Sequence, residues 1–285
     1  MTQLAIATDK KNQFLISEDQ PLISSLSSKG IKASPFIWNQ INAPELKTNT
    51  ILIRSIWDYY LNPNVFYSWL DALDANQIKT FNSSSILRWN ANKKYLEEFK
   101  SKGLPVVETA WVSTLESIEE SLKQIDANLI VLKPSISAGG YLTFCISKQE
   151  GDKISKAFHT ISSHSEVMVQ PFLDEISLNG ELSLIYIDNK FSHGVLKKPQ
   201  TNNFLVQAQY GGSEQLITHP PKEAISLSEK ILNTLPGLLY ARVDLICIKQ
   251  CWHLSELELI EPRLFFNLYP KAINTFVNAL AQRLN

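Results

Sequence analysis

An apolar stretch near the carboxyl end, "LSELELIEPRLFF" at residues 254–266, carries three glutamates in a segment that should be buried. Glu256 and Glu258 are two residues apart, so on a strand both side chains point to one face. Glu261 stands just before Pro262, where the strand should end. Because several buried carboxylates without partners would cost too much free energy, the fold must bring positive charge to them.

A second strand supplies part of that charge. The stretch "YARVDLICI" at residues 240–248 places Arg242 and Asp244 on one face. If it pairs with the glutamate strand as a hairpin, one aspartate, two glutamates and an arginine converge. Carboxylate oxygens select Mg2+, which prefers one or two carboxylates together with nucleotide phosphates. We therefore predict that magnesium bound with ATP supplies the missing charge; the alternative is a solvent-facing strand whose acids bind nothing.

The overall composition excludes several classes of partner. The 285 residues are enough for two domains, and a formal net charge of -1 leaves no basic surplus for nucleic acid or a membrane surface. The first apolar run is too short for a signal peptide, and no uncharged apolar stretch has membrane-spanning length. Three cysteines indicate a reducing compartment. We expect a soluble cytoplasmic protein with small-molecule substrates, and a homodimer stays open.

The cysteines also raise the question of zinc. Cys247, Cys251 and His253 have the spacing C-x3-C-x-H. No second Cys/His pair lies at the spacing of a zinc finger, so structural roles are the preferred interpretation.

The first eighty residues alternate apolar runs with polar helical stretches. Strands are predicted at 3–8, 31–38 and 50–57, and a helix at 63–76. Such alternation is typical of a parallel sheet with flanking helices, so we predict an N-terminal α/β domain over residues 1–84.

The pattern changes in the remainder, residues 85–285. We predict a helix at 91–103 with Asn90 as its cap and Gly103 as its stop, and a helix at 113–125 opened by a Ser113–Glu116 capping box. The other expected helices are 151–162 and 270–284. The expected strands are 129–134, 141–147, 166–172, 181–188, 190–198, 203–210, 238–248 and 252–260.

Two lysines are candidates for phosphate binding. In "VLKPSISAGG", Lys133 ends a strand and a loop closes with Gly139 and Gly140, whose backbone amides can approach a phosphate. A plain hairpin turn would explain this stretch about as well. Lys93, in "NANKKYLEEF", is the second candidate, and its alternative is a solvated helix lysine.

A nucleoside could bind at "EVMVQPFLDEISLNGELSL". The end of this strand can offer backbone groups to an adenine edge, while Phe172 or Leu173 lines the face of the base. Glu181, just after Gly180, could accept hydrogen bonds from ribose hydroxyls; otherwise it is an exposed acid at a strand end.

The acceptor substrate is expected at "RSIWDYY". Arg54, Trp57, Asp58 and Tyr59 follow an apolar strand, at the carboxyl end where α/β sheets bind ligands. We predict that Arg54 holds a substrate carboxylate, which its planar guanidinium matches, and that Asp58 holds an ammonium. The alternative is an internal Arg54–Asp58 ion pair that shapes the turn.

In this order the motifs resemble the ATP-grasp superfamily, in particular its glutathione-synthetase and ribosomal-protein glutamate ligase branch. Several stretches are similar to the O-ureido-serine cyclo-ligases of cycloserine biosynthesis: "RSIWDY", "VQPFL", "GELSL", "FSHGVLKKP" and "ELELIEP". The resemblance spans nearly the whole chain. It implies an α/β (α+β) fold with a pre-ATP-grasp domain over 1–84 and an ATP-grasp domain over 85–285, whose small lobe covers about 104–172.

The resemblance also implies roles for individual residues around ATP. Lys93 and Lys133 are the expected phosphate lysines and Glu181 the ribose acid. Lys197 or Lys198 falls where the family has a cation near the transferred phosphate, and Lys198 is the one assigned. The expected adenine hinge is Gln170, Pro171, Phe172 and Leu173.

The catalytic and metal residues follow in the same way. Arg242 resembles the arginine that stabilises an acyl-phosphate, and Asp244 the first metal ligand. The family ends in Glu-x-Asn, so Glu256 takes the glutamate position and Glu258 stands where asparagine is usual. That departure leaves a Glu258–Glu261 pair open and raises the demand for a second Mg2+ ion.

The implied activity is an ATP- and Mg2+-dependent carboxylate–amine ligase. Such enzymes phosphorylate a carboxylate and let an amine attack the acyl-phosphate, here on a small amino-acid-like substrate to give an amide, peptide or ring. The alternatives are a small-molecule kinase on the same scaffold and an ATP-binding regulatory protein without turnover.

Overall fold

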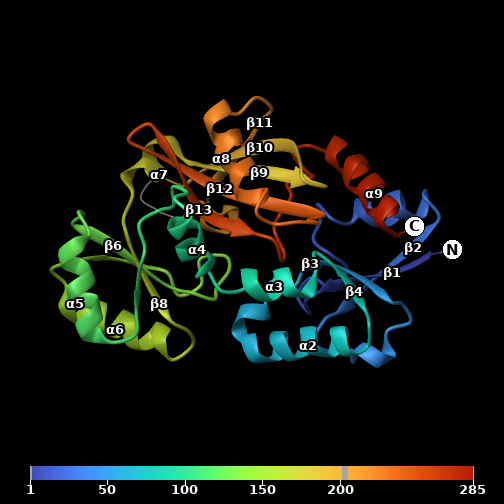
Figure 1. The fold of residues 1–285 in the computed structure, drawn as a ribbon, viewed down its shortest axis with the longest axis horizontal. Helices are drawn as coiled ribbons and strands as arrows, with labels where there is room; N and C mark the ends of the chain where they lie inside the picture. The colour runs from blue at the N-terminus through green and yellow to red at the C-terminus, as the bar shows by residue number, and fades with distance from the viewer. Residues whose placement is uncertain (1, 201–204, 285) are drawn as a thin grey trace.

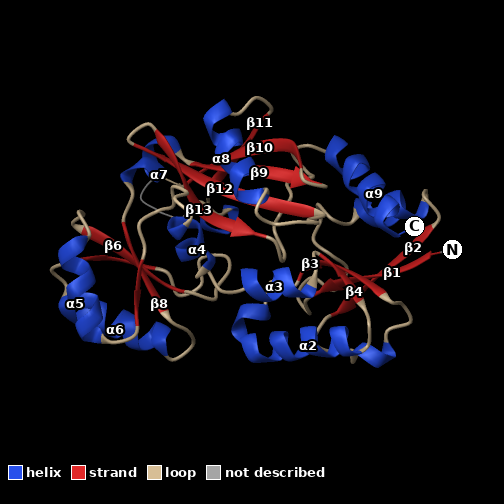
Figure 2. Ribbon diagram, viewed as in Figure 1, coloured by secondary structure: helices blue, strands red, loops and turns tan. Residues whose placement is uncertain are grey.

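The computed structural model describes residues 2–200 and 205–284, and the strands of this part form three separate sheets (Figures 1 and 2). The N-terminal sheet has the order β2-β1-β3-β4 and is parallel throughout. Its strands are β1 (Thr2–Thr8), β2 (Ile31–Ile37), β3 (Thr50–Ser55) and β4 (Lys79–Phe81). The predicted alternation of strands and helices is therefore confirmed.

Helices cover the two faces of this sheet. Helix α2 (Pro63–Ala75) buries Phe66, Trp69, Leu70 and Leu73, the spacing of one apolar helical face. Helix α1 (Pro21–Ser27) packs beside the C-terminal helix α9 (Lys271–Leu284). Two short 3-10 helices, η1 (Ala43–Glu45) and η2 (Tyr59–Leu61), lie in the connections.

The C-terminal helix belongs to the same core as the N-terminal sheet. Phe276 and Leu280 of α9 share one buried cluster with Leu4 and Ile6 of β1. In Figure 1 the red helix accordingly lies beside the blue strands. The two ends of the chain thus stabilise each other, and the boundary at residue 84 stays a prediction.

The second sheet has the order β5-β8-β6-β7 and is antiparallel. Its strands are β5 (Ala110–Val112), β6 (Leu129–Pro134), β7 (Phe144–Ser147) and β8 (Val167–Pro171), and helices α5 (Leu115–Gln124) and α6 (Gly151–Ser162) pack against it. The predicted Ser113–Glu116 capping box is wrong by one residue. Thr114 caps α5 instead, because its hydroxyl accepts from the Ser117 amide at 3.2 Å.

The third and central sheet has the order β11-β10-β9-β12-β13 and is antiparallel. Its strands are β9 (Glu181–Ile187), β10 (Lys190–Lys198), β11 (Ser213–Ile217), β12 (Tyr240–Ile248) and β13 (Cys251–Glu258). Helix α8 (Lys222–Leu232) packs against this sheet, and α7 (Asp174–Asn179) leads into it.

One predicted strand is wrong. The run at 203–210 begins in residues outside the described part, and its remainder holds the 3-10 helix η3 (Ala208–Tyr210) instead of a strand. Leu205 lies over Gly140, so this apolar side chain packs on the glycine loop, and Val206 is buried. The strand of this region is β11, which begins directly after Gly211 and Gly212.

The helix predicted at 91–103 is shorter than expected, because only α4 (Tyr95–Ser101) lies in that range. Helix α3 (Ser84–Asn90) precedes it outside the predicted range, and Lys93 lies in the turn between the two helices. Asn90 is not a helix cap. Its amide group donates to Leu257 O and accepts from the Leu259 amide, both at 2.8 Å, and so ties α3 to the end of β13.

Within the described residues, no helix is long and apolar enough to cross a membrane.

Candidate active site

A cavity of about 1260 Å³ lies among the three sheets. The N-terminal domain lines it with Asp58 and Tyr59, the second sheet with Lys133 and Gln170, and the central sheet with Arg242. This volume exceeds that of typical small-ligand pockets. The site can therefore hold a nucleotide together with a second substrate.

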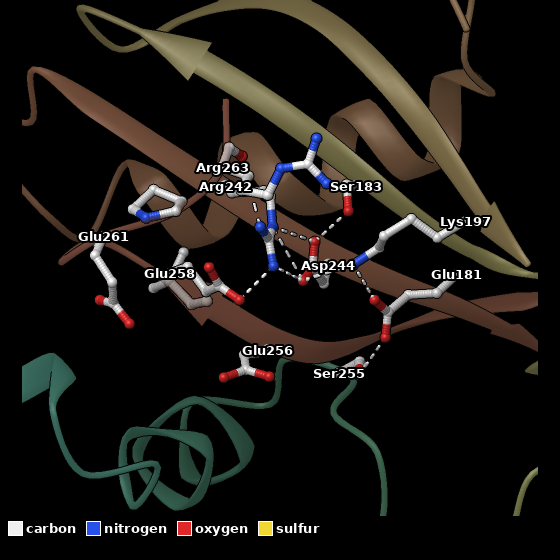
Figure 3. A network of polar contacts seen from close by, with 12 residues as sticks. Glu181, Ser183, Lys197, Arg242, Asp244, Ser255, Glu256, Glu258, Glu261 and Arg263 are labelled. Carbon is white, nitrogen blue, oxygen red and sulfur yellow. Dashed lines mark hydrogen bonds and ion pairs between the residues drawn. The ribbon is translucent and has the colours of Figure 1, made fainter. Parts of the chain in front are cut away.

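The acid-bearing strands pair as the sequence predicts. In the β12–β13 hairpin Arg242 stands opposite Glu258, and Asp244 stands opposite Glu256. The Arg242 guanidinium contacts the Glu258 carboxylate and lies 2.9 Å from a carboxylate oxygen of Asp244 (Figure 3). Positive charge from within the chain therefore offsets part of the acid cluster.

The two acids beside Arg242 differ in their electrostatics. Burial alone would raise the pKa of Asp244, but Arg242 and then Lys197 outweigh it and hold that pKa at about 2. Ser183 Oγ also donates to Asp244 at 2.5 Å. Burial raises the pKa of Glu258 to about 7 despite Arg242, helped by the charges of Glu256 and Asp244. Asp244 is thus a fixed anion, while Glu258 lacks sufficient positive charge.

Lys197, and not Lys198, belongs to this cluster. Lys197 is buried, contacts Glu181 and lies 3.2 Å from Asp244, whereas Lys198 is exposed and its ammonium is 3.4 Å from Leu178 O. The assignment of Lys198 is therefore corrected. Consecutive strand residues point to opposite faces, and the register Lys197↔Glu181 turns Lys197 inward.

The two predicted phosphate lysines both line the cavity. The Lys93 ammonium lies 3.2 Å from the Glu256 carboxylate and donates to Ser137 O at 2.5 Å. The Lys133 ammonium makes no ion pair or hydrogen bond within residues 2–200 and 205–284. Burial lowers its pKa, and an anion bound beside it would favour its charged form.

The glycine loop lies against the segment after β10. Gln209 donates to Gly139 O at 2.9 Å, and Tyr210 donates to the same oxygen at 3.3 Å. Gly140 has φ +79° and leaves about 3.3 Å between an added Cβ and Leu205, so a side chain would be both strained and crowded.

The predicted hinge and ribose acid also line the cavity. Gln170 donates to Thr109 Oγ1 at 2.7 Å, and the Phe172 amide donates to Leu129 O at 3.0 Å. These two hydrogen bonds hold the end of β8 in place. Pro171 and Leu173, in the same stretch, line the cavity. Glu181 accepts from Ser255 Oγ at 3.2 Å.

Arg54 does not reach this cavity. It is 1% exposed, its guanidinium lies 3.1 Å from the Asp19 carboxylate, and it donates to Pro262 O at 3.0 Å. The predicted substrate role is therefore corrected, because Asp19 already neutralises this charge inside the protein. The alternative Arg54–Asp58 pair is also wrong: Asp58 accepts from Trp38 Nε1 at 2.6 Å and lines the cavity.

The sequence reasoning missed a second group of charged residues on the cavity wall. Arg263 lies 3.0 Å from the Glu18 carboxylate and contacts Glu214 of β11. Glu18 also accepts from the backbone amides of Leu264 at 3.0 Å and Phe265 at 3.2 Å. The available signal was an arginine within the apolar run "EPRLFF". Its partners could not be read from the sequence, because Glu18 is 245 residues and Glu214 is 49 residues away along the chain.

The acids fit magnesium by their chemistry. Asp244, Glu256 and Glu258 offer only oxygen atoms from two paired strands, and the raised pKa of Glu258 marks a shortage of positive charge. In the described residues no three His, Cys, Asp or Glu side chains are grouped to hold a metal ion. Such a group is not required, since Mg2+ commonly takes one or two carboxylates and completes its shell with phosphates and water.

Comparisons with known proteins agree with this geometry. The model of a family described as the N-terminal domain of D-cycloserine synthetase DcsG matches residues 4–82. The chain is 23% identical over 298 residues to the cycloserine biosynthesis protein DcsG of Streptomyces lavendulae, covering 99% of this chain and 98% of that protein.

Solved structures show the fold. The crystal structure of D-cycloserine synthetase DcsG has a TM-score of 0.89 at 20% identity and covers 99% of this chain and 100% of its own. A RimK domain ATP-grasp protein from Sphaerobacter thermophilus has a TM-score of 0.74 at 15% identity, covering 99% and 98%. D-alanine–D-alanine ligase from Bacillus anthracis has 0.71 at 14%, covering 100% and 98%. The predicted ATP-grasp fold and the predicted resemblance are confirmed.

Proposed function

We propose that this chain, which has the ATP-grasp fold, is an ATP- and Mg2+-dependent ligase that joins a carboxylate to a nitrogen nucleophile through an acyl-phosphate. One observation carries the proposal: four cations and the carboxylates of the β12–β13 hairpin line a single cavity. The cations are Lys93, Lys133, Lys197 and Arg242. Such an arrangement neutralises a triphosphate and leaves acids for a metal.

ATP would lie with its base at the end of β8 and its phosphates toward the glycine loop. Gln170 to Leu173 would line the adenine, and Glu181 would accept from the ribose hydroxyls. Lys133 would pair with a phosphate oxygen, because it has no partner in the described residues. A charge-assisted hydrogen bond of this kind contributes about 1.5–3 kcal/mol.

One or two of the carboxylates of Asp244, Glu256 and Glu258 would hold each magnesium ion, with phosphate oxygens and water completing its shell. When bound, the ion neutralises charge on the transferring phosphoryl group. Two ions remain our expectation, because Glu258 adds a negative charge where the family has a neutral asparagine. The Glu258–Glu261 pair stays open as an alternative.

The reaction balances without a further co-reactant. A carboxylate oxygen attacks the γ-phosphorus, the bond to ADP breaks, and an acyl-phosphate forms. The nitrogen nucleophile then attacks the acyl carbon, loses a proton, and phosphate leaves with the former carboxylate oxygen. Arg242 faces the cavity and would stabilise the equatorial oxygens and the tetrahedral adduct, with Lys197 close by.

We propose a small amino-acid-like substrate. Support comes from the relatives, which are named for cycloserine biosynthesis. O-ureido-D-serine is accordingly the first compound to test. The acceptor side would include Asp58, which lines the cavity, accepts from Trp38 Nε1 through one carboxylate oxygen, and is one of the acids near which a substrate ammonium could lie. We also expect the protein to act in the cytoplasm, where ATP is available.

The test is ADP release in the presence of Mg2+ across O-ureido-D-serine and D- and L-amino acids, alone and in pairs, with product masses recorded. A ligase releases ADP and phosphate together and forms a product that has lost the elements of water; a ureido substrate that closes to cycloserine loses its carbamoyl portion in addition. ADP release with the phosphoryl group retained on an acceptor hydroxyl would identify the kinase alternative. Tight ATP binding without any release would identify the regulatory alternative.

A further inference from the structure

Glu261 differs from the other acids that line the cavity because, in the described residues, it has neither a basic partner nor a hydrogen-bond donor from another residue. Asp9 and Asp58 also lack a basic partner there, but Asp9 accepts from Asn12 and Asp58 accepts from Trp38. Glu261 is 8% exposed and lines the cavity, yet no lysine, arginine or histidine in the described residues lies within ion-pair distance. Apart from its own backbone amide, no described group donates to its carboxylate. In Figure 3 it stands apart from the network of dashed lines.

Each of its acidic neighbours has a basic partner within the chain. Glu256 pairs with Lys93, Glu258 and Asp244 pair with Arg242, and Glu181 pairs with Lys197. Lys93 is the cation that most favours the Glu261 anion, but its ammonium is held by Glu256 and Ser137. Negative charge therefore exceeds positive charge in the surroundings of Glu261.

The backbone around Glu261 is anchored on both sides, which fixes the position of its Cα beside the cavity. Its own carbonyl accepts from Trp57 Nε1 at 3.1 Å. The Ile260 carbonyl accepts from the Tyr240 hydroxyl at 2.9 Å, and the Pro262 carbonyl accepts from Arg54 at 3.0 Å. A buried carboxylate held in this way costs free energy unless a bound ligand supplies positive charge.

The wall beside Glu261 suits an organic cation. Tyr59 lines the same cavity, and its hydroxyl makes no hydrogen bond within the described residues. After burial, Glu261 is the charge that most strongly raises the pKa of Tyr59. Trp57 and Tyr60 also face this cavity. An ammonium has several donors and is attracted to aromatic faces, whereas Mg2+ demands octahedral oxygen ligands.

We infer that Glu261 binds the ammonium group of the amino-acid substrate, with the Tyr59 hydroxyl as a second acceptor. This inference rests on the proposed ligase function and adds a residue that determines specificity. Asp58 is the competing acid. It is only half-buried, so water screens its charge, and one of its carboxylate oxygens already accepts from Trp38. Glu261 should therefore distinguish an amino acid from the same carboxylate without its amino group.

The test compares matched substrates in hydroxylamine, which traps an acyl-phosphate as a hydroxamate. D-alanine is paired with propionate, and D-serine with 3-hydroxypropionate, each with ATP and Mg2+. Wild type should prefer the amino acids. In Glu261→Gln the KM for the amino acids should rise about 10- to 100-fold, with kcat changed less and the use of the des-amino acids unchanged. Tyr59→Phe should give a smaller change of the same kind.

The control is Glu119→Gln, an exposed acid on α5, which should leave both substrate classes unchanged. The inference is overturned if Glu261→Gln keeps the wild-type preference, or if Asp58→Asn abolishes it alone. It is also overturned if Glu261→Gln raises the Mg2+ requirement and slows both classes equally, since that pattern marks a metal ligand.

A binding measurement separates this inference from the proposed function. Isothermal titration of D-alanine and D-serine into the ADP-loaded protein does not depend on turnover. Binding that weakens about 10-fold or more in Glu261→Gln supports the inference even if no acyl-phosphate forms. A wild type that binds none of these amino acids overturns it, even where ATP consumption with another carboxylate supports the ligase.

Discussion

Arg242 stands opposite Glu258 in the β12–β13 hairpin, and its guanidinium contacts that carboxylate. The same guanidinium donates to Asp244 on its own strand. One cation is therefore shared by two acids, and the pKa of Glu258, raised to about 7 by burial and by the nearby acids, shows that the sharing is incomplete. Magnesium with a nucleotide would complete the charge balance.

Asp244→Asn should uncouple nucleotide binding from magnesium. The Asp244 carboxylate is held ionised by Arg242 and Lys197, so it is the acid best prepared to meet a cation. Titrations of ATP with and without Mg2+ should show a large gain from the ion in wild type and little gain in the variant. Equal ATP affinity with and without Mg2+ in wild type would contradict the assignment.

Lys133→Ala should weaken ATP binding without reducing stability. Lys133 has no partner in the described residues, so its removal breaks no internal interaction, while the loss of a phosphate contact should cost about 1.5–3 kcal/mol. Lys198→Ala is the matched comparison, because that lysine is exposed on β10. Calorimetry should find reduced affinity in the first variant alone; unchanged affinity in a folded Lys133→Ala would remove Lys133 from the site.

The sequence predicted the hairpin of acids because strand periodicity alone places Arg242 with Asp244 and Glu256 with Glu258. It could not choose between Lys197 and Lys198, since the choice depends on the register with β9. It also misplaced Arg54, because the compensating acid is Asp19, 35 residues earlier, and no local pattern reveals such a pair.

Local signals failed for similar physical reasons elsewhere. The run at 203–210 looks like a strand, but its described part leads into the 3-10 helix η3, and Leu205 packs over Gly140 of the glycine loop. Asn90 has the chemistry of a helix cap, but its amide pairs with the end of β13. Long-range contacts decide both cases, and single-sequence patterns do not contain them.

Arg54→Lys should lower stability and leave ATP affinity unchanged. The guanidinium bonds Asp19 through two nitrogens in a site where both side chains are fully buried, and an ammonium cannot copy that geometry. Because lysine keeps the positive charge, the loss should be smaller than the about 3–5 kcal/mol that is typical when one partner of a buried ion pair is removed. Chemical denaturation measures the loss. A variant of wild-type stability that no longer uses substrate would restore the binding role.

The double variant Arg54→Met with Asp19→Leu provides the control for this ion pair. It removes both charges, so much of the stability lost in either single variant should return. Double-variant losses equal to the sum of the singles would show that the two residues act independently.

His193 should make the protein sensitive to acid. Burial lowers the pKa of this histidine from its ordinary 6.5 to about 4, and Leu264 O lies 3.0 Å from Nε2. Between about pH 4 and 6.5, His193 is therefore protonated in the unfolded chain and neutral in the folded chain. Stability is full above about pH 6.5 and is lost as the pH falls toward 4.

The measurement is the melting temperature of wild type and His193→Gln between pH 7 and 5, a range chosen from the histidine shift. Wild type should lose more stability over this range than the variant does. Parallel curves would show that His193 does not contribute to the acid response.

The central claim is that the γ-phosphoryl group of ATP is transferred to a substrate carboxylate. A substrate identified in the ADP-release panel is labelled with 18O in that carboxylate, and the released phosphate is analysed by mass spectrometry. Our account predicts that each phosphate carries one 18O atom, because the acyl carbon keeps only one of the two carboxylate oxygens. Unlabelled phosphate, or label in AMP with release of pyrophosphate, would contradict it.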